Sequence, residues 1–296
     1  MTFLKQSTHR VNSVRWLLVL LILSLKALGC NLKNSDFTSP EGYDLNNPVT
    51  IKLPLELDEI SGVAYYAKDT SVMAINDEYG RLYKIFLNRP NIIHTWPFTK
   101  GADFEDVSLI DSNFYVLKSN GNIICFRFIT RDSIYFAEYT FPFGTQNEFE
   151  ILYFDSSRQK IMLICKDCES DKKSYLSTFS FDPWTLEYEA SPFQIDVTKI
   201  AAAIGEKKIR FKPSAAAINP VTRELYIISA VNDLLVIADD AGRTKKVFKI
   251  DGGLFKQPEG ITFSPQGTMI ISNEAADIGV ANILIFPYQK TGRKTP

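Results

Sequence analysis

The sequence predicts an all-β fold, a five-bladed β-propeller with one short inserted helix. Three observations support this prediction. Similar stretches recur with a spacing mostly in the forties, each stretch holds several short apolar strands, and turn residues separate these strands. A period of this length with several strands per unit is the sequence signature of a propeller.

The clearest unit lies near the end of the chain, at residues 257–275. Its two predicted strands, 261–263 and 269–271, flank a turn in which Pro265 restricts φ and Gly267 accepts a positive φ. A third strand follows at residues 282–286. These segments make up most of a four-stranded blade.

Four further units align with this one and begin near residues 59, 103, 148 and 212. One column of residues runs through all five units, and its consecutive members lie 44, 45, 64 and 45 positions apart. The strands are apolar on both faces, as blades packed on each side require. A sixth, degenerate blade near residues 141–147 or inside the long interval is the alternative count. The column consists of Ser61, Glu105, Glu150, Ser214 and Glu259.

The 64-residue interval holds the predicted helix, at residues 195–209. Asp196 can cap its start, Ile200 and Ile204 supply an apolar face, and Gly205 can end it. A further strand at residues 49–54 comes too early for the first unit. It could complete the last blade and close the ring, which hides an open sheet edge.

Residues 1–29 resemble a secretory signal peptide. They hold four basic residues and no acidic ones, with an apolar run at residues 16–25. A run this short does not cross a bilayer, which takes about 20 residues. The alternative is an uncleaved amphipathic or membrane-anchoring start. Without residues 1–29 the net charge falls from −1 to −5, which argues against nucleic acid as a partner.

Residues 27–30 resemble the bacterial lipobox, in which the cysteine receives a lipid, although Lys26 and Leu28 depart from the usual pattern. We therefore expect a lipid on Cys30 and a protein that is exported and anchored to a membrane of a bacterial cell envelope. The expected domains are a signal peptide at 1–29, a lipidated N-terminus and tether at 30–47, the propeller at 48–290, and a polar tail at 291–296.

Column residues at the entry to each innermost strand should surround one mouth of the central channel. Glu105, Glu150 and Glu259 would then converge, and carboxylates brought together repel unless they are protonated or share a cation. Calcium takes six to eight oxygen ligands, for which carboxylates are suited. The alternative is that each glutamate caps backbone amides or pairs with a lysine or arginine, and the spacing alone leaves both interpretations open.

Polar residues that follow the second strand of each unit should lie on the same rim, where they could add ligands or contact a partner. Turn-forming residues are the alternative interpretation for most of them. The candidates retained as additional ligands or rim contacts are Ser61, Asp77, Asn273 and Glu274.

Cysteine and histidine content argues against zinc and against nucleophilic catalysis. Cys165 and Cys168 form an isolated CxxC, and a closed zinc site needs four ligands. Unpaired buried thiols are favoured there, with a local disulfide as the alternative. His94 is the sole histidine after residue 29, and we expect it to pack beside Trp96 rather than serve in a triad.

Four motifs stand out along the chain, namely EISGVAY, FEDVSLI, KPSAAAINPVTRELYIISA and PEGITFSPQGTMIISNEA. These motifs resemble the SdiA-regulated family of exported bacterial propellers, which are distantly like NHL-repeat propellers and are often lipoproteins. The resemblance covers residues 51–288 and implies a five-bladed propeller with a calcium site. The chain departs from the family pattern at Asp106, Ile151 and Ala215, where glycine is favoured, and at Ser214, where an acid is favoured.

Two functions follow from these features. The sequence favours a membrane-tethered, calcium-binding module that binds a protein or small ligand on its rim, because catalytic equipment is sparse. The alternative is a calcium-dependent hydrolase, similar to propellers of the lactonase and phytase type, in which a channel metal activates water.

Overall fold

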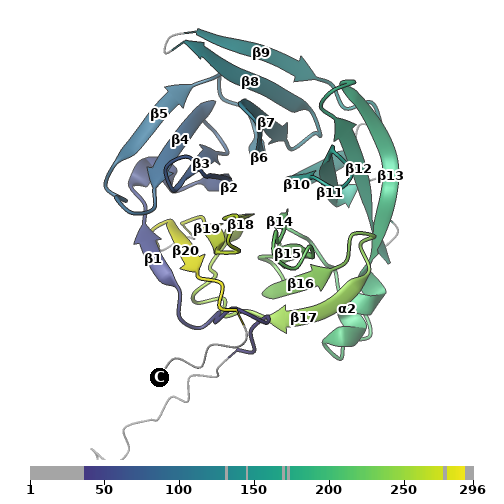
Figure 1. The fold of residues 1–296 in the computed structure, drawn as a ribbon. Coiled ribbons are helices and arrows are strands. Elements are labelled where there is room, and N and C mark those ends of the chain that lie inside the picture. Colours follow the sequence, from purple (N-terminus) through teal and green to yellow (C-terminus); the bar gives the residue numbers. More distant parts are fainter. Residues whose placement is uncertain are drawn as a thin grey trace, which may run out of the picture. The chain divides into compact units, whose positions relative to one another are not determined.

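The structure is a computed structural model that describes residues 37–290, apart from 131–132, 145, 169–170, 172–173 and 276–278. Five antiparallel four-stranded sheets surround a central channel, as Figure 1 shows. The prediction of an all-β, five-bladed propeller is therefore confirmed. The described residues contain no sixth blade, and residues 141–144 and 146 form a connection between two sheets.

The blades follow one another along the chain. Blade 1 contains β2 (Ile60–Tyr66), β3 (Ser71–Asn76), β4 (Arg81–Phe86) and β5 (Ile93–Pro97). Blade 2 contains β6 (Phe104–Ile110), β7 (Asn113–Lys118), β8 (Ile123–Thr130) and β9 (Ser133–Tyr139). Blade 3 contains β10 (Asn147–Asp155), β11 (Lys160–Cys168), β12 (Tyr175–Asp182) and β13 (Glu187–Asp196). Blade 4 contains β14 (Ala215–Ile218), β15 (Leu225–Ser229), β16 (Leu234–Ala238) and β17 (Thr244–Lys249).

Blade 5 joins the two ends of the ring. Its inner strands are β18 (Pro258–Phe263), β19 (Met269–Asn273) and β20 (Asn282–Phe286), and its outermost strand is β1 (Val49–Lys52). Val49 pairs with Ile285, and Ile51 pairs with Ile283. This confirms that the early strand closes the ring. A 3-10 turn at Leu55–Leu57 then leads from blade 5 into blade 1.

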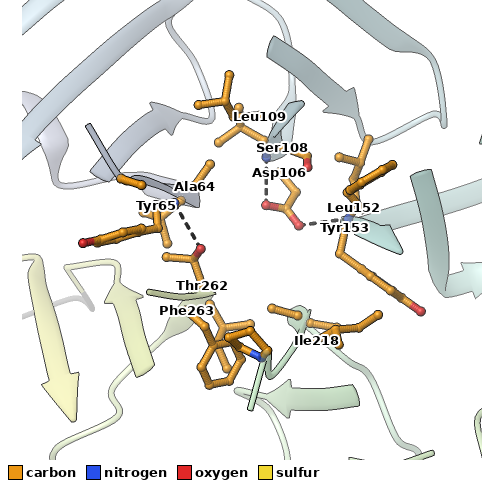
Figure 2. Close-up of a pocket in the computed structure, with 18 of the residues that line it drawn as sticks. Ala64, Tyr65, Asp106, Ser108, Leu109, Leu152, Tyr153, Ile218, Thr262 and Phe263 are labelled. Atoms are coloured by element: carbon orange, nitrogen blue, oxygen red, sulfur yellow. Dashed lines mark hydrogen bonds between the residues drawn. The ribbon is translucent and has the colours of Figure 1, made fainter. Parts of the chain in front are cut away.

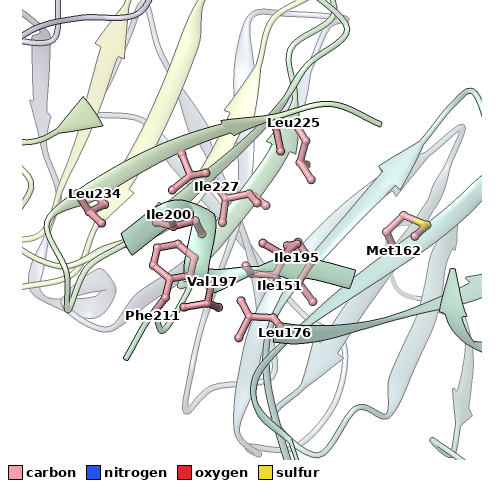
Figure 3. Close-up of a cluster of buried hydrophobic side chains, with 14 of the residues drawn as sticks. Ile151, Met162, Leu176, Ile195, Val197, Ile200, Phe211, Leu225, Ile227 and Leu234 are labelled. Atoms are coloured by element: carbon pink, nitrogen blue, oxygen red, sulfur yellow. The ribbon is translucent and has the colours of Figure 1, made fainter. Parts of the chain in front are cut away.

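Apolar side chains on both faces of each sheet pack between neighbouring blades. The described residues form five buried clusters, one at each junction between blades. The cluster between blades 3 and 4, drawn in Figure 3, joins Ile151 and Met162 to Leu225 and Ile227. Burial of apolar area in these seams stabilises the ring by about 25 cal/mol per Å².

The inserted helix is α2 (Val197–Ala203), and it covers one end of that seam. The side chain of Asp196 accepts a hydrogen bond from the amide of Thr198 at 2.9 Å, and Gly205 adopts φ +79° after the helix. Ile200 is fully buried. The predicted helix, its cap and its stop are therefore confirmed, although the helix is shorter than residues 195–209, because residues 195–196 belong to β13 and the helix ends at Ala203.

The propeller includes residues that the sequence analysis assigned to the tether. Tyr43 and Leu45 are buried in the seam between blades 4 and 5. The hydroxyl of Tyr43 donates to the carbonyl of Gly267 at 2.6 Å and accepts from the amide of Asn219 at 2.7 Å. The burial of Tyr43 and Leu45 explains why this mostly polar segment packs against the seam between blades 4 and 5.

The predicted signal peptide, Cys30 and the tail at 291–296 lie outside the described residues. Within the part of the chain that the structure describes, no helix has the length and apolarity needed to cross a membrane.

Candidate functional site

The five innermost strands are β2, β6, β10, β14 and β18. Equivalent positions of neighbouring strands approach closely, as Gly62 does Asp106 and Ser214 does Pro258, so these strands begin at the same end of the channel. The predicted column lies at this end. Glu105 and Glu259 are the second residues of β6 and β18, Glu150 is the fourth residue of β10, and Ser214 directly precedes β14.

Each of the three column glutamates lies at a β-bulge. The pairing of β6 with β7 shifts between Phe104 and Asp106, and that of β18 with β19 shifts between Pro258 and Gly260. In blade 3 the shift spans Glu150. A bulged residue has no direct partner across the ladder, and bulges commonly redirect side chains at functional sites.

The two serines of the column join blades. The Ser214 hydroxyl donates to the carbonyl of Pro258 at 2.6 Å, which links blade 4 to blade 5. The carbonyl of Ser61 accepts from the hydroxyl of Ser272 at 2.9 Å, which links blade 1 to blade 5. Both serines are buried. These bonds show a role for the serine positions in holding the ring together.

Glu105 and Glu259 carry strongly perturbed carboxyl groups. Burial and the charges of Asp103 and Glu259 raise the pKa of Glu105 to about 8, against the opposing charge of Lys166. Burial raises the pKa of Glu259 to about 7, where Lys166 opposes the shift and Asp77 adds to it. The two glutamates, which are 154 positions apart, therefore act on one electrostatic site.

The loops after β3 and β19 bring further acids to the same place. Burial, a hydrogen bond with Glu59 and neighbouring negative charges raise the pKa of Glu274 to about 8. Burial and the charges of Glu59, Glu78 and Asp103 raise the pKa of Asp77 to about 6. One oxygen of Asp77, Oδ1, is buried without a hydrogen-bond partner in the described structure.

We call this group of carboxyl groups the acidic mouth. Three of its members, Glu59, Glu78 and Asp103, were not among the residues predicted from the sequence. Glu59 and Asp103 each directly precede an innermost strand and stand two positions before Ser61 and Glu105, so their equal place in the repeat was the signal that could have found them. The acidic mouth consists of Glu59, Asp77, Glu78, Asp103, Glu105, Glu259 and Glu274.

Lys166 in β11 reaches this site. Its ammonium pairs with the carboxylate of Glu150 and with Glu148 at 3.0 Å, and its charge lowers the pKa of both Glu105 and Glu259. Glu150 thus has the lysine partner that the sequence left open as the alternative to a metal. The three column glutamates share the field of one lysine.

The acidic mouth is not a preassembled metal cluster. Among the described residues, the only group of three or more His, Cys, Asp or Glu ligand atoms within 4.8 Å of one another is Cys165, Cys168 and Asp171. Cys165 and Cys168 form a disulfide bond. The expectation of unpaired thiols at these positions is therefore wrong, because the bulge in β11 brings the two sulfur atoms together.

Asn273 holds the end of β19 in place. Its side chain is fully buried, and Nδ2 donates to Oδ1 of Asn282 at 3.0 Å. His94 lies on β5, where its ring packs against Phe86 and Trp96, as expected for a packing role.

The fold and this site define a class, the five-bladed β-propellers with an acidic channel mouth. The model of the SdiA-regulated family matches residues 49–276, and the chain belongs to that family. No match was found among curated proteins.

Solved structures resemble this chain at low sequence identity. A glutaminyl cyclase from Myxococcus xanthus has 11% identity and a TM-score of 0.50, with 82% of this chain and 98% of that chain covered. A luciferin-regenerating enzyme has 10% identity and a TM-score of 0.49, with 83% and 96% covered. A streptogramin B lyase has 11% identity and a TM-score of 0.45, with 81% and 97% covered. These likenesses concern the fold alone.

Proposed function

We propose that this protein is a binding module whose acidic mouth holds a divalent cation, with calcium as the preferred ion. The observation that carries the proposal is the concentration of carboxyl groups with raised pKa around one lysine. Such groups repel one another when ionised, and a cation between them removes the repulsion.

The donor chemistry of the acidic mouth fits calcium. Carboxylate oxygens are hard ligands that calcium accepts in flexible geometry, and no thiol or imidazole belongs to the group. The orphaned Oδ1 of Asp77 is a buried acceptor without a donor. Glu105, Glu259, Glu274 and Asp77 would hold the ion, which would supply positive charge to the mouth.

When no metal is bound, protons on some of these carboxyl groups reduce the repulsion between them. Glu274 shares a hydrogen bond with Glu59, and Glu105 shares one with Asp103. A hydrogen bond between two carboxyl groups requires a proton on one of them. Calcium binding would therefore release protons from these pairs, and the affinity would rise with pH.

We further propose that the propeller is exported and tethered to a membrane through a lipid on Cys30. The disulfide between Cys165 and Cys168 supports an oxidising compartment, since cytosolic thiols are usually kept reduced. A tethered ring would present its rim to a protein or small ligand.

The experiment that tests the metal proposal is a calcium titration by isothermal calorimetry after treatment with a chelator. Glu259→Gln should weaken binding at least tenfold, whereas Glu206→Gln, which removes one exposed carboxylate away from the mouth, should not. Equal affinities of the two variants, or no binding to the wild type, would refute the metal site.

One observation favours a second function, a calcium-dependent hydrolase. Glu105 and Glu259 have pKa values of about 8 and about 7, within the range useful for general acid–base catalysis at neutral pH. Assays of lactones and phosphoesters with and without calcium separate the two functions. Turnover that needs both calcium and Glu105 would replace the binding module with the enzyme.

A further inference from the structure

A second site lies deeper in the channel, beyond the acidic mouth. A pocket of about 400 Å³ is lined by later residues of all five innermost strands, as Figure 2 shows. This volume is in the range of small-molecule sites. Much of its wall is aliphatic, with Ala64, Leu109, Leu152, Ile218 and Ile261 each contributed by a different blade.

Asp106 of β6 is the sole charged side chain among the described residues that line this pocket. It is 5% exposed. Oδ1 accepts the amide N–H of Val107 at 2.8 Å, and Oδ2 accepts that of Leu152 at 2.9 Å, so the carboxylate bridges blades 2 and 3 (Figure 2). The two amides hold the carboxylate in place, and a carboxylate can accept about four hydrogen bonds.

The lining decides which ligand chemistry suits the pocket. No lysine, arginine or histidine belongs to the described lining, so an anion would find no counter-charge. A bare metal ion would find one carboxylate where calcium takes six to eight oxygen ligands. A primary ammonium group needs few acceptors, and a hydrocarbon body attached to it would gain free energy from burial against the aliphatic wall.

We propose that the channel pocket binds a primary amine, with its ammonium group on Asp106 and its hydrocarbon part against the wall formed by the five inner strands. This site is distinct from the acidic mouth, and the inference goes beyond the proposed metal function. Asp106 stands where blades 1 and 5 carry Gly62 and Gly260, so the charge is a particular feature of blade 2. Burial raises the pKa of the Asp106 carboxyl group well above its usual range, because the described lining of the pocket holds no counter-charge, and a bound ammonium group would favour the ionised form.

The test is calorimetry on the full chain, in chelator, with four probes of matched size or charge. Hexylamine should bind, and ethylamine, hexanol and hexanoate should bind at least tenfold more weakly. Equal binding of hexylamine and ethylamine, both stronger than that of hexanol, would mean that charge alone attracts the amine to the acidic mouth. That result would overturn the proposal. Equal binding of hexylamine and hexanol would overturn it as well.

Variants locate the site. Asp106→Asn should reduce hexylamine affinity at least tenfold, whereas Ser108→Ala, in the same pocket, should retain it. Glu259→Gln alters the mouth and should leave hexylamine affinity unchanged while calcium binding falls. Loss of hexylamine binding in Glu259→Gln would place the amine at the mouth and refute the pocket site. If Asp106→Asn does not fold, the four-probe comparison on the wild type still decides the proposal.

Discussion

A Cβ atom on Gly62 in β2 would lie 2.2 Å from Oδ1 of Asp106 in β6. The two residues occupy equivalent positions, since each follows a member of the column in its own blade. Gly260 makes a similar approach, because its Cβ would lie 2.8 Å from the carbonyl oxygen of Ser61. The inner strands of blades 1 and 2, and of blades 5 and 1, thus approach so closely that a side chain in place of Gly62 or Gly260 would meet the neighbouring strand.

Gly62→Ala should lower the free energy of unfolding by about 3 kcal/mol, the upper end of the usual cost of overpacking. The added methyl group would meet backbone atoms of Asp106 and Val107 as well as the carboxylate, and backbone atoms cannot rotate away. Chemical denaturation measures the change. Gly253→Ala is the control, since its Cβ would meet a side-chain oxygen of Asp251 at 3.2 Å, and equal costs for the two variants would contradict the close approach.

The stability of the metal-free protein should decrease as pH rises from about 5 to about 8. Glu259, Glu105 and Glu274 have folded-state pKa values of about 7, 8 and 8, above the ordinary glutamate value of 4.5. Between these values the folded state binds more protons than the unfolded state, so the free energy of unfolding falls with pH. Urea denaturation in chelator at several pH values measures the slope.

Glu105→Gln combined with Glu274→Gln provides the control for this pH dependence, because the two titrating groups are removed. The slope between pH 5 and pH 8 should become shallower. Saturating calcium should have a similar effect on the wild type and raise its unfolding free energy at pH 8 by about 2.7 kcal/mol at a hundredfold excess over the Kd. If the slope between pH 5 and pH 8 remains in the double variant and in the calcium-saturated wild type, other groups cause it.

Lys166→Met should increase calcium affinity by about tenfold, which corresponds to about 1.4 kcal/mol. The lysine ammonium pairs with Glu150 and lowers the pKa of Glu105 and Glu259, so it competes with a metal for the same negative charge. Calorimetry measures the affinity. Lys160→Met, on the other end of β11 and paired with Glu189, should leave it unchanged; weaker binding in Lys166→Met would mean that the lysine organises the site.

Ile51→Ala should destabilise the protein by about 2 kcal/mol or more, because Ile51 is buried in the seam between blades 5 and 1. Its neighbour Val49 in the same strand is 58% exposed, and Val49→Ala should change stability by less than about 0.5 kcal/mol. Thermal unfolding compares the two. Equal small effects would indicate that β1 adds little to closure of the ring.

Local patterns in the chain account for what could be predicted. The five blades, the helix behind Asp196 and the closing strand at residues 49–54 each follow from apolar runs, turn residues and caps that lie within a few positions of one another. The column was visible for the same reason, since it repeats at the start of each unit.

The acidic mouth needed information that no single unit contains. Glu105, Glu150 and Glu259 lie at bulges, and the sequence shows no bulge because these strands are apolar on both faces, so one extra residue breaks no alternation. The disulfide between Cys165 and Cys168 depends on the same local geometry. Glu59 and Asp103 belong to the site because their charges raise the pKa of Asp77.

The repeat thus specified the ring, since strand pairing and seam burial depend on residues within one unit and its neighbour. The three-dimensional arrangement decided where charge accumulates. Lys166 acts on Glu105 and Glu259, and Asp106 fills the space left by Gly62, only because separate blades converge on one axis. Electrostatic energy depends on distances between charges, and closure of the ring sets those distances.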